Sequence, residues 1–110
     1  MLDFATAHKA LIERILEGDG RASPDRRRAA FDNGGLIEPL RTLIDKVVNH
    51  AYKVTDTDVA AARASGASED EIFELVVCAS IGQATRQYHA ARAALEAAMN
   101  GREHAPRDPR

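Results

Sequence analysis

The spacing of apolar residues along the chain predicts five helices and no strand. Apolar side chains recur three or four residues apart, the period of one helix face, in residues 2–17, 25–32, 36–51, 57–65 and 69–99. The most regular stripe consists of Leu36, Ile37, Leu40, Leu43, Ile44, Val47, Val48 and Ala51. No segment alternates between apolar and polar residues as a half-buried strand does. The predicted fold class is therefore all-α, a small helical bundle of about five helices.

Residues that favour helix ends separate these segments. Ser23 followed by Pro24 suits the start of the second helix, because Ser caps a helix and Pro is tolerated at its first position. The Asn-Gly-Gly run at 33–35 ends that helix. Thr55 or Asp56 is the expected N-cap of the fourth helix.

The corner between the fourth and fifth helices is predicted in the most detail. Gly66 is expected to end the fourth helix in a left-handed conformation. Ser68 and Glu71 have the spacing of a capping box, in which each side chain binds the backbone of the other residue. The fourth and fifth helices should therefore form a hairpin, with the third helix packed on both.

The length and composition predict one small domain that is stabilised by association with a second copy. At 110 residues there is room for one modest core, which we assign to residues 1–100. Hydrophobic residues make up 45% of the chain but aromatic residues only 5%, so each helix buries little area. We therefore expect a homo-oligomer. The polar segment 101–110, which contains two prolines, is expected to be a disordered tail.

The charge and cysteine content exclude several classes of protein. A net charge of −2 argues against a dedicated nucleic-acid-binding protein, which would be strongly basic. A single cysteine excludes an intrachain disulfide and suits a reducing compartment. No apolar run approaches the roughly 20 residues that cross a bilayer, and the first residues form an amphipathic pattern rather than a signal peptide. We expect a cytoplasmic protein without a membrane or nucleic-acid partner.

One further pattern combines Ala62, Gly66, the corner 67–71, the Ile-Phe-Glu run at 72–74 and a small-residue helix that ends near Leu95. This pattern, within residues 54–95, resembles the alkylhydroperoxidase D-like branch of the carboxymuconolactone decarboxylase family. The resemblance implies that family's helical architecture and association between copies through such helices. It covers less than half of the chain.

The redox residues of that family are missing. Its redox members carry Cys-x-x-Cys-x-x-x-His, and the matching positions here are Ala51, Val54 and Asp58. The upstream glutamate of the family falls near Pro39, one residue from Glu38. A disulfide-cycling peroxidase needs one thiolate to attack and a second thiol to resolve the product, so we expect no such activity. Nothing in the sequence indicates a cofactor.

Candidate catalytic residues are His50, His89 and Cys78. His50 lies at the edge of the apolar stripe of the third helix, and His89 shares a face of the fifth helix with Arg86. Each histidine could act as an acid or base, although a structural histidine is the more common situation. Cys78 is either a small buried core residue or a one-cysteine sensing thiol activated by a histidine.

Candidate binding residues are Arg86, Tyr52 and Asp58. Arg86 could hold the carboxylate of a small ligand, or pair with a carboxylate such as Glu74 across a subunit boundary. Asp58 could accept a proton if burial raised its pKa. No histidine spacing suits a metal site. The basic run at 26–28 is expected to be a solvated helix face.

Three functional hypotheses follow. The first is a catalytically divergent, oligomeric binding or scaffold protein. The second is a cofactor-free decarboxylase or isomerase of a small carboxylated lactone, with a histidine as acid or base and Arg86 holding the carboxylate. The third is a thiol sensor that acts through Cys78.

Overall fold

The computed structural model describes residues 3–104 of the chain, and this part is all-α, as the apolar pattern predicts. The helices are α1 (Phe4–Glu17), α2 (Pro24–Asp32), α3 (Leu40–Asn49), the short 3₁₀ helix η1 (Ala51–Lys53), α4 (Asp56–Ala64) and α5 (Glu69–His104). No strand occurs within residues 3–104. None of the helices in this range is long and apolar enough to span a membrane.

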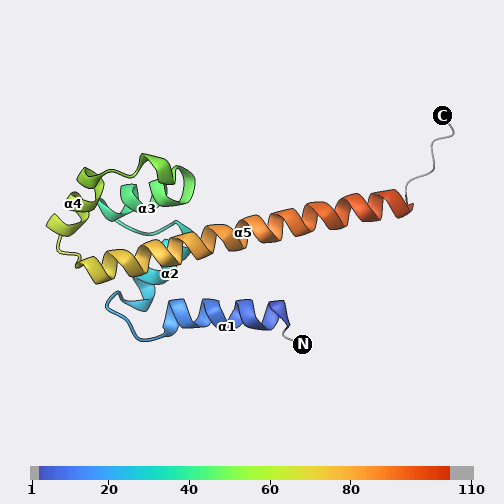
Figure 1. The fold of residues 1–110 in the computed structure, drawn as a ribbon, viewed down its shortest axis with the longest axis horizontal. Helices are drawn as coiled ribbons and strands as arrows, with labels where there is room; N and C mark the ends of the chain where they lie inside the picture. The colour runs from blue at the N-terminus through green and yellow to red at the C-terminus, as the bar shows by residue number, and fades with distance from the viewer. Residues whose placement is uncertain (1–2, 105–110) are drawn as a thin grey trace.

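The long helix α5 is the axis of the molecule (Figure 1). Its 36 residues correspond to about 54 Å at 1.5 Å per residue, most of the 65 Å length of the whole structure. Helix α1 runs along one side of α5, whereas α3 and α4 lie on the other side, and α2 crosses near the first half of α5. The second half of α5 extends beyond the other helices, toward the C-terminus.

The local helix-end signals are confirmed. The Ser23 side chain accepts a hydrogen bond from the backbone N–H of Arg26, and Pro24 follows it at the first helical position. Asn33 ends α2 with a left-handed φ of 51°. Thr55 is the N-cap of α4 and forms a capping box with Asp58.

The corner between α4 and α5 also has the predicted form. Gly66 has a φ of 108°, a conformation that residues with a Cβ rarely adopt. The Ser68 hydroxyl accepts a hydrogen bond from the backbone N–H of Glu71 at 3.1 Å, and the Glu71 carboxylate accepts one from the backbone N–H of Ser68 at 3.3 Å. The two helices therefore form the expected hairpin, and α3 contacts both of them.

Three helices, α1, α3 and α5, differ in extent from the prediction. Helix α3 begins at Leu40, so Leu36 and Ile37 precede it, because Pro39 disfavours a helical conformation at the residue before it. Helix α5 continues through His104, four residues into the segment 101–110 that we expected to be a disordered tail. Helix α1 begins at Phe4 rather than at Leu2. Residues 1–2 and 105–110 lie outside the part that the structure describes.

The core is built mainly from small and aliphatic side chains on α2, α3 and the first half of α5, and it also includes Phe31, Leu16 of α1 and Ala62 of α4. Its fully buried large members are Leu43, Ile44, Leu75 and Cys78. Helix α2 makes the most extensive contact with α5. This approach depends on Gly82, because a Cβ there would lie 2.0 Å from the Phe31 carbonyl oxygen. Gly82 therefore allows α2 and α5 to pack closely.

Candidate functional site

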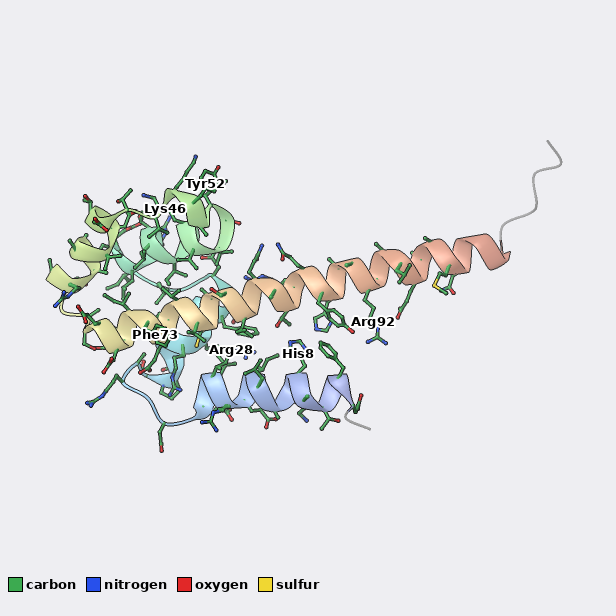
Figure 2. The ribbon with its side chains drawn as sticks, in the orientation of Figure 1. His8, Arg28, Lys46, Tyr52, Phe73 and Arg92 are labelled. Atoms are coloured by element: carbon green, nitrogen blue, oxygen red, sulfur yellow. The ribbon has the colours of Figure 1, made fainter. Side chains whose placement is uncertain are left out.

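The six candidate residues do not form one site. His50 and Tyr52 are neighbours at the end of α3, with ring centroids 6.0 Å apart, and Tyr52 is 82% exposed. Figure 2 shows Tyr52 on the side of the molecule opposite to α1. His89 belongs to the α1 side, where it faces His8. The structure therefore does not bring the two predicted histidines into one site.

Asp58 has a structural role that occupies both of its oxygens. The Lys46 ammonium donates hydrogen bonds to Oδ1 at 2.9 Å and Oδ2 at 2.8 Å, and the backbone N–H of Thr55 donates to Oδ2 at 2.9 Å. The hydrogen bond from Lys46, followed by that from Thr55, lowers the pKa of Asp58 below its ordinary value. A proton-accepting role would need the opposite shift.

Arg86 is held by the end of α2. Its Nη1 donates a hydrogen bond of 2.6 Å to the Phe31 carbonyl oxygen, and its Nη2 donates one of 3.1 Å to the side chain of Gln83. The Phe31 carbonyl lies near the C-terminal end of α2, where a cation is favourable because of the helix dipole. Arg86 thus joins α2 to α5, and Glu74 is engaged elsewhere.

His89 lies in a groove between α1 and α5 with a histidine that the sequence analysis missed. The rings of His8 and His89 are 6.3 Å apart, and Phe4 and Tyr88 complete the cluster. His8 Nε2 is 3.0 Å from the hydroxyl of Thr85 on α5. Figure 2 shows His8 directed from α1 toward α5. The groove has a volume of about 280 Å³ and includes two cations, Lys9 and Arg92.

Cys78 lies in the core at 1% exposure. Its thiol is 3.4 Å from the backbone carbonyl oxygen of Ile15. Burial raises the pKa of the Cys78 thiol, and the nearby charge of Arg27 opposes this only partly. A reactive thiol needs exposure and a lowered pKa, so Cys78 has the properties of a core residue.

Arg27 is the most unexpected residue of the structure. The basic run at 26–28 was expected to be a solvated face, and for Arg27 this expectation is wrong, since only 5% of it is exposed. Its Nη1 donates hydrogen bonds to the carbonyl oxygens of Ile15, at 3.3 Å, and Gly18, at 2.7 Å. These carbonyls lie at the C-terminal end of α1, where backbone acceptors lack helical partners. Burial of Arg27 depends on the α1–α2 connection, which no local pattern reveals.

Glu74 holds the same connection from the α5 side. Its carboxylate accepts hydrogen bonds from the backbone N–H groups of Arg21, at 2.8 and 2.9 Å, and Ala22, at 2.9 Å. Burial alone would raise the pKa of Glu74 and is the largest single influence, but the two backbone donors and the charges of Arg27 and Arg21 together lower it. Glu74 is thus an ionised anchor for the segment before α2.

Comparison with known proteins identifies no relative: no family model, no curated protein and no solved structure matches this chain. At the positions that correspond to the family's redox residues, Ala51 lies in η1, Val54 follows η1, and Asp58 lies in α4. Within the part of the chain that the structure describes, no group of three or more His, Cys, Asp or Glu side chains could hold a metal ion.

Proposed function

We propose that this protein is a divergent, non-peroxidase member of the alkylhydroperoxidase D-like family that works as a self-associating helical scaffold. The observation that supports self-association is the second half of α5. Every residue from 86 to 101 is exposed, and this stretch includes Leu95 at 61% and Met99 at 50%. A helical segment with few tertiary contacts is only marginally stable in water, so a packing partner would stabilise it.

A second copy of the chain is the partner that best fits this surface. The exposed half of α5 is rich in alanine, which allows two helices to approach closely. Arg92 and Glu96 form an ion pair of 3.0 Å on it. If two such helices run antiparallel, Arg92 of one copy can face Glu96 of the other, so the surface complements itself, as a twofold interface requires.

Light scattering at micromolar concentration tests this proposal. We expect a mass that is a multiple of 11.9 kDa. Replacing Leu95 or Met99 by Glu should shift the mass toward the monomer, because a charge would then lie in the apolar contact. Ile37→Glu is the matched control, since Ile37 is 74% exposed but lies outside α5, and it should leave the mass unchanged. A monomer mass for the unaltered chain across this range would refute self-association.

The absence of peroxidase activity has its own test. Because the chain has a single cysteine, an oxidised Cys78 has no second thiol within the molecule to resolve it. We expect thiol-dependent turnover of an organic peroxide to be no faster than with the Cys78→Ser variant. Turnover clearly above that control would contradict the proposal.

The two alternative functions receive less support from the geometry. A sensor that acts through Cys78 would need an exposed thiol, whereas Cys78 is buried and the pKa of its thiol is raised. A lactone decarboxylase or isomerase would need Arg86 free to hold a carboxylate, whereas its guanidinium is bound to the carbonyl of Phe31. The groove beside His89 is the one observation that favours acid–base chemistry.

A further inference from the structure

A cavity of about 360 Å³ lies where the C-terminal end of α1, helix α2 and the first half of α5 meet. Its walls combine apolar side chains with charged ones: Ile15, Phe73 and Val77 together with Arg14, Asp19, Arg27 and Glu74. Phe73 lines this cavity and is 69% exposed, so it lies at the mouth, and Figure 2 shows it on the first half of α5. A concave, largely apolar site with a few polar groups is the usual form of a small-molecule site.

Arg27 has hydrogen-bonding capacity that the protein does not use. Both of its hydrogen bonds are made by Nη1, to the carbonyls of Ile15 and Gly18. Its Nε is buried and has no partner in the structure. Neither of the two hydrogen bonds that Arg27 forms within residues 3–101 uses Nη2. A buried donor without a partner is costly, so an acceptor supplied from the cavity would be favourable.

The charges around Arg27 favour an anion with a carboxylate group. Glu74 also lines the cavity, but its two oxygens are already bound to the backbone N–H groups of Arg21 and Ala22. Arg14 makes no side-chain hydrogen bond or ion pair with any residue between 3 and 101, so its guanidinium adds an available positive charge. Arginine binds carboxylates in a planar, two-point geometry.

We infer that this cavity binds a small carboxylate with a branched apolar body, whose carboxylate is bound by Arg27 and Arg14 and whose apolar part packs on Ile15, Val77 and Phe73. The site is independent of the self-association proposed above, because it lies on the first half of α5. Asp19 also lines this cavity, and its carboxylate could pair with an ammonium group on the ligand. An apolar α-amino acid is therefore one source of this ligand, and a simple branched acid is the other.

Titration of the 15N-labelled full chain with isovalerate, leucine and isovaleramide tests the inference. We expect saturable amide shifts around Ile15, Gly18 and Val77 with isovalerate, and a dissociation constant of about 1 mM or below for a ligand of this size. Isovaleramide has nearly the same shape without the charge, and it should bind at least about tenfold more weakly. Tighter binding of leucine than of isovalerate would identify the amino acid as the source, and the reverse would identify the simple acid.

Variants separate a binding role from the structural role of Arg27. Arg14→Met and Val77→Phe change the cavity without touching the hydrogen bonds to the end of α1, and each should weaken binding about tenfold or more. Arg28→Met is the matched control, because Arg28 neighbours Arg27 in sequence but pairs with Asp32 at the surface, and binding should be unchanged. Equal responses to isovalerate and isovaleramide, or no saturable shift with any of the three compounds, would overturn the inference.

Discussion

The two halves of α5 belong to one uninterrupted helix but have different environments. Between residues 69 and 85, every third or fourth residue is buried against the other helices, among them Ile72, Leu75, Ala79 and Gly82. From residue 86 to 101 every residue is exposed. Both halves are rich in small residues, so composition does not distinguish them. The difference arises from what packs on each half, and equivalent substitutions should therefore have different effects in the two halves.

The largest effect is expected at Gly82. A Cβ there would lie 2.0 Å from the Phe31 carbonyl oxygen, which belongs to backbone and cannot move aside easily. Gly82→Ala should therefore lower the free energy of unfolding by about 3 kcal/mol, measured by chemical denaturation. The same substitution at Gly101, in the exposed half, meets no atom within 4 Å and should instead raise stability by up to about 1 kcal/mol. Equal effects at the two glycines would contradict the comparison.

The next largest effect on the free energy of unfolding is expected at Glu74, whose carboxylate on the first half of α5 binds the backbone of the segment before α2. Glu74→Gln replaces the carboxylate, which accepts hydrogen bonds from the backbone N–H groups of Arg21 and Ala22, by a neutral amide. It should lower the free energy of unfolding by about 1.5–3 kcal/mol. Glu96→Gln, in the exposed half, is the control and should change the free energy of unfolding very little.

Glu74 should also make the stability depend on pH. Its pKa is lower in the folded protein than its ordinary value of 4.5, so the unfolded chain takes up the proton first as the pH falls. The stabilisation from Glu74 is thus fully present above that value and is lost as the pH falls below it toward the folded pKa. Asp58, whose pKa is also lowered, acts in the same direction. Denaturation curves from pH about 6 to 3 should show a weaker decline for Glu74→Gln than for the unaltered chain.

A smaller effect is expected at the corner where α5 begins. Gly66→Ala should cost about 1 kcal/mol or more, because its φ of 108° is unfavourable for a residue with a Cβ. Ser68→Ala should cost about 1 kcal/mol, since the hydroxyl that caps α5 is lost. Ser80→Ala is the control, because this exposed hydroxyl bonds only to the carbonyl of Val76 within the same helix. A Ser68→Ala variant as stable as Ser80→Ala would contradict the role of the cap.

The features that could be predicted from the sequence are those whose interacting residues lie close together along the chain. Ser23, Thr55, Gly66 and Ser68 act within a few residues of their own position, so local patterns indicated their roles. Arg27 is buried by contacts with residues 9 and 12 positions away, and the Glu74 carboxylate binds backbone more than 50 positions away. A local charge pattern contains no information about such contacts.

The residues that come together at the groove could not be predicted for the same reason. The groove of His8 and His89 joins the first and last helices, and its hydrogen bond links residues 77 positions apart in sequence. The periodicity of a single helix could place His89 on a face but could not show which helix that face meets. His8 was missed because nothing in α1 alone distinguishes it from an exposed histidine.

The smallest effect is expected at the ion pair of the exposed half. Arg92 and Glu96 are each about 60% exposed, and a pair of this kind adds little to the stability of one chain. Arg92→Glu should therefore leave the unfolding midpoint nearly unchanged. In an antiparallel contact between two copies, however, it places like charges opposite each other, and the dissociation constant should rise roughly twofold to fivefold.

The double variant Arg92→Glu with Glu96→Arg restores opposite charges across the same contact, and light scattering should show that self-association recovers. Recovery supports the antiparallel arrangement, in which residues 92 and 96 face each other across the twofold axis, when the unfolding midpoints of the single and double variants agree, because the i,i+4 pair within one helix changes as well. High salt should reduce the difference between the single and the double variant, since it screens exposed charges. If the double variant associates as weakly as Arg92→Glu, the second half of α5 does not pair with itself in this way.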